Sequence, residues 1–91
     1  MRESEVERYF RWAVMQRGGI TYKFKSPTRG GVSDRIACMP NGETWFVELK
    51  QPNGRLSELQ KLFAGQMQRL KQNYACLWSK EMVDEWVARF N

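Results

Sequence analysis

The sequence has 91 residues, with a net charge of +5 from 15 Lys and Arg against 10 Asp and Glu, two Cys and no His. This length predicts one domain over residues 1–91. The missing His excludes catalytic and metal sites that need imidazole, and two Cys are too few for a four-Cys zinc site. No apolar run approaches the ~20 residues of a membrane span, so we expect a cytoplasmic, intracellular protein with no membrane partner.

Hydrophobic periodicity divides the chain into seven elements. Apolar residues at helical spacing predict helices at residues 3–17 and 58–72, and a last helix after Ser79. Alternating or short apolar runs predict strands at residues 20–25, 34–39, 44–50 and 74–78. The order α-β-β-β-α-β-α indicates an α/β (α+β) fold with a mixed central sheet flanked by helices.

Two local sequence signals predict a turn and a helix start between these elements. Residues 40–43, with the sequence Pro-Asn-Gly-Glu, predict a turn that makes a hairpin of the second and third strands. Ser57 and Gln60 have the spacing of a capping box at the start of the second long helix.

Basic residues dominate the middle of the chain, while acidic residues gather near its two ends. Basic surface of this kind favours a polyanionic partner, and nucleic acid first among polyanions. An ordinary solvated basic protein explains the same charge about equally well, so the charge alone does not assign a function.

The third predicted strand carries charged residues where it should be apolar. Glu48 and Lys50 are two residues apart, so both side chains leave the face that carries Phe46, whereas the opposite face is wholly apolar. A buried carboxylate or ammonium is costly unless it is paired or bound to a metal. This strand end is therefore the first candidate for chemistry.

Asp34 opens the neighbouring predicted strand. A hairpin loop of three or five residues, or one bulge, would place Asp34 opposite Glu48, whereas a two-residue loop would not. Two carboxylates beside Lys50 form a hard-cation site suited to Mg²⁺ or Mn²⁺. From the residues alone, an exposed cross-strand ion pair of the same three side chains stays an alternative.

The pattern Asp34 … Glu48-Leu49-Lys50, after a helix that carries Glu7, resembles the PD-(D/E)xK nucleases. More closely, the whole chain resembles a stand-alone VRR-NUC domain, the virus-type replication-repair nuclease module with a restriction-endonuclease-like core. One departure is Ser33, which stands where the family usually has proline before the aspartate. The matching stretches are Val6-Glu7-Arg8, Gly18-Gly19, Lys23-Phe24-Lys25-Ser26-Pro27, Gly31-Val32-Ser33-Asp34-Arg35, Phe46-Val47-Glu48-Leu49-Lys50 and Gln60.

The resemblance implies metal-dependent hydrolysis of phosphodiester bonds in DNA, with 5′-phosphate products. Asp34 and Glu48 would ligate Mg²⁺ or Mn²⁺, with the backbone carbonyl of Leu49 as a further ligand. Lys50 would orient the attacking water and stabilise the charge that grows on the phosphate.

The resemblance also implies two supporting residues. Glu7 would reach the metal from the first helix, through a water molecule, although Glu3 could serve instead. Gln60 would support the site or touch the phosphate backbone, and a capping role explains it almost as well. Four basic residues are expected to bind DNA phosphates as a group: Lys23, Lys25, Arg29 and Arg35.

Stand-alone members of the resembled family look like Holliday-junction resolvases, which implies a homodimer that cuts four-way junctions in DNA repair or recombination. The small size and the aromatic content favour such a dimer. A bacterial or phage-infected host cell is what the resemblance suggests. The alternatives are a flap or general nuclease, a restriction-type enzyme, a catalytically inactive DNA-binding module, and an RNA-associated basic protein.

Overall fold

The computed structural model describes residues 1–90 and confirms the predicted order of elements. No helix within those residues is long and apolar enough to cross a membrane. The boundaries differ from the predicted ones by at most three residues; the second long helix ends early because Lys71 has a φ of 57°. The elements are α1 (Glu3–Gln16), β1 (Ile20–Lys23), β2 (Arg35–Cys38), β3 (Thr44–Leu49), α2 (Glu58–Arg69), β4 (Asn73–Leu77) and α3 (Lys80–Val87).

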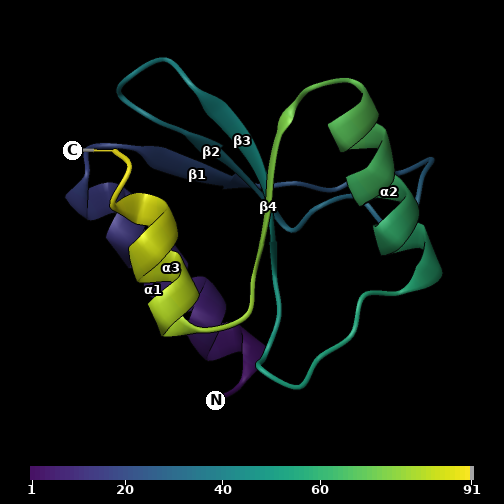
Figure 1. Cartoon of the computed structure of the whole chain (residues 1–91), viewed down its shortest axis with the longest axis horizontal. Helices are drawn as coiled ribbons and strands as arrows, with labels where there is room; N and C mark the ends of the chain where they lie inside the picture. Colours follow the sequence, from purple (N-terminus) through teal and green to yellow (C-terminus); the bar gives the residue numbers. More distant parts are fainter. Residues whose placement is uncertain (91) are drawn as a thin grey trace.

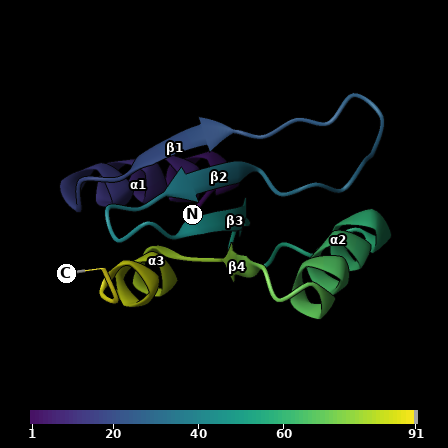
Figure 2. The ribbon, with the colours of Figure 1, turned by 90° about the horizontal axis from the view of Figure 1, so that it is seen from above.

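The four strands form one mixed sheet in the order β1-β2-β3-β4. β1, β2 and β3 pair antiparallel, whereas β4 runs parallel to β3 because α2 carries the chain back between them. Figure 1 shows α1 and α3 side by side on one side of the sheet and α2 on the other. Seen from above in Figure 2, α2 and the segment that joins β1 to β2 extend towards the right of the view, whereas α1 and α3 lie on the left.

The hydrophobic core lies between the sheet and the pair α1 and α3. Val47 and Leu49 are fully buried on this face, as the alternation of β3 predicts. Phe10 of α1 packs against Trp86 of α3, with ring centroids 5.3 Å apart, and Trp86 reaches Trp45 of β3 at 5.6 Å. These contacts fix which face of β3 points inward, and so which face carries Glu48.

The hairpin between β2 and β3 sets the register that the site needs. Its connection has five residues, 39–43, and the backbone N–H of Met39 donates to the carbonyl of Glu43 at 2.9 Å. Gly42 turns the chain at a φ of 90°, which a residue without Cβ adopts freely. Arg35 pairs with Val47, and the same register continued by one residue brings Asp34 opposite Glu48.

The second face of the sheet is only partly covered. Phe63 of α2 packs against Phe46 of β3 and Tyr74 of β4, with ring centroids 5.9 and 6.2 Å apart. No residue of α2 is fully buried, because the helix covers the β3–β4 end of the sheet alone. Ile20 and Tyr22 of β1 lie on the same face and remain exposed.

Replacing Phe10 by Ala should lower the free energy of unfolding by about 3–5 kcal/mol, because it opens a cavity in the core between α1 and α3. Urea unfolding followed by circular dichroism measures this loss. The control is Met15→Ala on the same helix, an exposed position where the change should stay within about 0.5 kcal/mol. Equal losses in the two variants would contradict the packing of α1 described above.

Candidate active site

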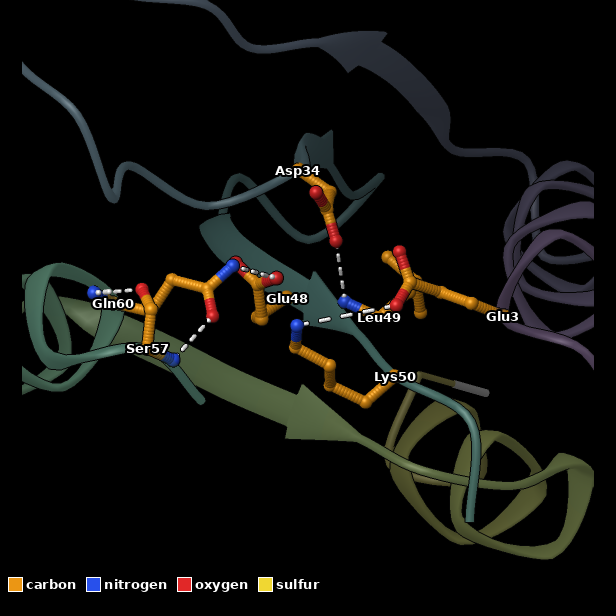
Figure 3. A network of polar contacts seen from close by, with 7 residues as sticks. All are labelled: Glu3, Asp34, Glu48, Leu49, Lys50, Ser57 and Gln60. Atoms are coloured by element: carbon orange, nitrogen blue, oxygen red, sulfur yellow. Dashed lines mark hydrogen bonds and ion pairs between the residues drawn. The ribbon is translucent and has the colours of Figure 1, made fainter. Parts of the chain in front are cut away.

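Asp34, Glu48 and Lys50 come together where β2 begins and β3 ends (Figure 3). Asp34 Oδ2 accepts a hydrogen bond from the backbone N–H of Leu49 at 2.9 Å. The carbonyl of Asp34 accepts another from the backbone N–H of Phe24, also at 2.9 Å. Asp34 is thus anchored to both neighbouring strands, and its side chain lies against the end of β3.

Glu48 is 1% exposed, and its carboxyl group is held by Gln60 of α2. Gln60 Nε2 donates to Glu48 Oε2 at 3.0 Å, while Gln60 Oε1 accepts from the backbone N–H of Ser57 at 2.8 Å. The backbone N–H of Gln60 also donates to Ser57 Oγ at 3.1 Å. Gln60 therefore closes the capping box of α2 and donates a hydrogen bond to Glu48 at once.

The exposed ion pair considered as an alternative is wrong. Glu48 is buried rather than solvated, and the ammonium group of Lys50 lies 3.9 Å from Glu3. Burying a carboxylate in this way requires compensation by hydrogen bonds or by a positive charge. Gln60 supplies one hydrogen bond to it.

The surroundings of Glu48 raise its pKa from 4.5 to about 8. The largest cause is desolvation on burial, and the second is Asp34, both through its negative charge and through a hydrogen bond between the two carboxyl groups. The charge of Lys50 opposes the shift without cancelling it. A carboxyl group whose pKa is raised by burial and by a neighbouring negative charge marks a site where added positive charge would be stabilised.

The glutamates of α1 have different partners. Glu3 is the one near the site: it lies 3.9 Å from Lys50, and its charge contributes to the raised pKa of Glu48. Glu7 instead accepts a hydrogen bond from Arg35 Nε at 2.9 Å. The structure thus places Glu3, the alternative, where Glu7 was predicted, because Arg35 holds Glu7 on the α1 side of the sheet.

The four predicted DNA-binding residues fall into two groups, one residue held by an ion pair and three that are exposed. The side chain of Arg35, which was predicted to bind DNA phosphates, is 12% exposed and donates a hydrogen bond to Glu7, so it joins β2 to α1. Lys23 is exposed at the end of β1, and Lys25 and Arg29 line a groove beside α2. Three of the four basic residues are therefore accessible to a phosphate backbone.

Ser33, which stands in the place of the family's usual proline, is fully buried. Its Oγ donates a hydrogen bond to the carbonyl of Arg35 at 3.3 Å. This hydrogen bond fixes the entry of the chain into β2 in the way that a proline ring would fix it by restricting φ.

Two contacts of the site were not identified from the sequence. A Cβ added to Gly31, which has a φ of 81°, would lie 2.4 Å from the backbone of Leu59, so the segment before Asp34 rests directly on the first turn of α2. Cys76 of β4 lies beside Glu48 in the register, and burial, followed by the charge of Glu48, raises the pKa of its thiol to about 12. The pair Gly30-Gly31 was the available sequence signal for the first contact; the second depends on strand register.

The donor set of this site fits a hard divalent cation. Within residues 1–90, no three side chains of the His, Cys, Asp and Glu types form a cluster arranged to hold a metal. The side-chain donors are the oxygens of Asp34 and Glu48, and burial together with the charge of Asp34 raises the pKa of Glu48. Oxygen donors that crowd negative charge are what Mg²⁺ and Mn²⁺ prefer, with water completing the coordination.

The chain is similar to a phage protein and to a solved structure. No protein-family model matches the sequence. The relative is "Putative nuclease p44" of Acyrthosiphon pisum secondary endosymbiont phage 1, which is 44% identical over 69 residues, 70% of this chain and 74% of that protein. The structure is a "VRR_NUC domain" with a TM-score of 0.90 and 24% sequence identity, covering 98% of this chain and 97% of that one.

The structure combines a mixed sheet with two carboxylates and a lysine at adjacent strand ends. This chain belongs to the same family as the phage putative nuclease and has the fold of a VRR-NUC domain, as the sequence resemblance indicated. A nuclease domain of this kind implies a DNA substrate.

In the absence of metal, the wild type should lose stability relative to Glu48→Gln as the pH rises from about 5 to about 8. The folded-state pKa of Glu48 lies above its value of 4.5, so its favourable contribution is complete below pH 4.5 and is lost as the pH passes about 8. Melting temperatures of both proteins in EDTA measure the difference. Glu58→Gln, an exposed position, should follow the wild type at every pH; a pH-independent difference for Glu48→Gln would contradict the prediction.

Proposed function

We propose that this nuclease is a divalent-metal-dependent, structure-selective DNA endonuclease that resolves four-way (Holliday) junctions as a homodimer. The observation that carries the proposal is the buried Glu48 beside Asp34, with Lys50 at the same strand end. Such a constellation suits the hydrolysis of a phosphodiester bond, in which negative charge grows on the phosphate during attack by water.

Asp34 and Glu48 would hold Mg²⁺ or Mn²⁺, and the backbone carbonyl of Leu49 would be a third ligand. The backbone N–H of Lys50 donates to the carbonyl of Leu77 in β4 at 3.0 Å, which supports this assignment because the Leu49 carbonyl of the same trans peptide then points away from β4. When bound, the cation supplies a water molecule of lowered pKa and positive charge next to the phosphate.

The remaining residues orient the reactants. Lys50 would position the attacking water and stabilise the phosphate charge, and Gln60 would keep the Glu48 carboxylate in its ligating orientation. Glu3 would restrain Lys50 and reach the cation through water, the role first expected of Glu7. The 3.9 Å separation of Glu3 and Lys50 supports this exchange of roles.

A four-way junction suits two copies of a small domain, because paired sites would cut opposing strands. The sheet face around Ile20 and Tyr22, which α2 leaves uncovered, offers an apolar surface for a second copy. A role in repair or recombination, in the cytoplasm of a bacterial or phage-infected cell, agrees with the phage relative.

The decisive measurement is cleavage of a labelled four-way junction beside a linear duplex of the same sequences, in Mg²⁺, Mn²⁺ or EDTA. Paired cuts confined to the junction and dependent on metal are expected. Asp34→Ala and Lys50→Ala should each lower the rate at least about 100-fold, since each removes a group that acts on the reacting phosphate. Lys61→Ala, an exposed lysine of α2 outside the site, is the matched control and should cleave normally.

Other outcomes of this experiment separate the alternatives. Cuts at one short sequence in the linear duplex would indicate a restriction-type enzyme, and cuts at single-strand branches alone would indicate a flap nuclease. Junction binding without cuts in any metal would indicate an inactive DNA-binding module. Full activity in Asp34→Ala would contradict the assignment of the site.

Tyr22→Asp should convert the proposed dimer to monomer, because it places an unpaired charge on the uncovered sheet face. Sedimentation velocity at micromolar protein concentration measures the change. Trp12→Asp makes the same replacement at an exposed aromatic residue of α1, on the other side of the sheet, and should leave the dimer intact. A wild type that sediments as a monomer with and without junction DNA would contradict the homodimer.

A further inference from the structure

A groove runs between α2 and the segment that joins β1 to β2. Its volume is about 660 Å³, within the range of small-molecule sites in proteins. Leu62 of α2 lines it and is 54% exposed. The apolar lining residues are Phe24, Pro27, Val32, Leu59, Leu62, Phe63 and Met67, and we call this surface the Phe24–Leu62 groove.

Each wall of the Phe24–Leu62 groove carries a residue that touches the candidate active site. On one wall the backbone N–H of Phe24 donates to the carbonyl of Asp34 at 2.9 Å. On the other wall, Leu59 directly precedes Gln60, which binds the Glu48 carboxylate. The close approach of Gly31 to Leu59 joins the two walls. The groove therefore adjoins the candidate active site.

The floor of the groove is a fixed aromatic cluster. The ring centroids of Phe24 and Phe63 are 6.3 Å apart, and both rings contact Phe46 at 5.9 Å. Rings packed in this way hold their orientation without a ligand, so binding would not require ordering them.

The charge of the groove selects an anionic occupant. Lys25 and Arg29 are the charged residues among its lining, and no acidic side chain lines it. A second copy of this chain has a net charge of +5 and is repelled by such a rim, whereas a nucleotide combines an apolar base with an anionic phosphate.

We propose that the Phe24–Leu62 groove receives an unstacked nucleobase of the strand being cut, while Lys25 and Arg29 hold the flanking phosphates. This inference rests on the proposed endonuclease function and adds a substrate class to it: DNA with an unpaired or easily unstacked nucleotide beside the scissile phosphate. Selectivity for branched DNA then arises because a fully stacked duplex must first be opened to place a base in the groove.

The test uses four-way junctions with 2-aminopurine, a fluorescent base that is quenched by stacking, at each position around the cut. The protein used for fluorescence carries Lys50→Ala, so that the junction is not cut, and its groove is unchanged. Its binding should raise the 2-aminopurine emission at one position by at least about twofold. Leu62→Ala with Met67→Ala should remove this rise and lower kcat/KM on the junction at least about fivefold in otherwise wild-type protein. Leu62→Trp, which fills the groove without loss of apolar surface, should act in the same direction.

The matched control is Leu70→Ala, which removes another exposed leucine directly after α2, outside the groove. It should keep both the emission rise and the cleavage rate, and circular dichroism melts confirm that all variants fold. Groove variants that match Leu70→Ala in both measurements overturn the inference, and retained junction cleavage would show that the proposed function stands without it.

Two further results would separate the groove assignment from the endonuclease proposal and from binding of a second copy. If no protein cleaves DNA but the emission rise appears and depends on Leu62, the groove assignment holds and the endonuclease proposal fails. If Leu62→Ala with Met67→Ala converts a dimer to a monomer and leaves emission unchanged, the groove binds a second copy and the inference is wrong.

Discussion

The burial of one carboxyl group, that of Glu48, constrains most of this structure. Val47 and Leu49 are fixed in the core on either side of Glu48, so the alternation of β3 forces Glu48 to the opposite face. There it must be hydrogen-bonded, and Gln60 can reach it because the Ser57 cap holds the first turn of α2 in place. The desolvated carboxyl group therefore links the sheet to α2, and its pKa is raised first by burial and then by the charge of Asp34.

The two faces of the sheet serve different purposes. The face under α1 and α3 holds nearly all of the fully buried apolar residues, and the free energy of packing is concentrated there. The other face carries only α2, which leaves the Phe24–Leu62 groove and the surface around Tyr22 accessible. Residues that interact with a substrate can lie on the thinly covered face because the fold does not rely on it for stability.

Close contacts between distant segments prepare the site before any ligand is bound. Gly31 brings the segment before Asp34 against Leu59, and Ser33 fixes its entry into β2. Arg35 ties the same strand to α1 through Glu7. Asp34 is thus restrained from three directions, which is what holds a catalytic group in a productive geometry.

Local patterns in the sequence determined the elements and the set of candidate residues. Period-two alternation located β3 and its inward face, and the capping box placed Gln60 at the start of α2. These features depend on residues near one another in the chain, so they could be read without the fold.

The tertiary structure decided which side chains contact one another in the site. Glu3 and Glu7 share one face of α1 and differ only in whether Lys50 or Arg35 lies opposite them, and the burial of Glu48 depends on where α2 packs. Such pairings join residues far apart in sequence, and their distances are set by packing, which no local pattern encodes.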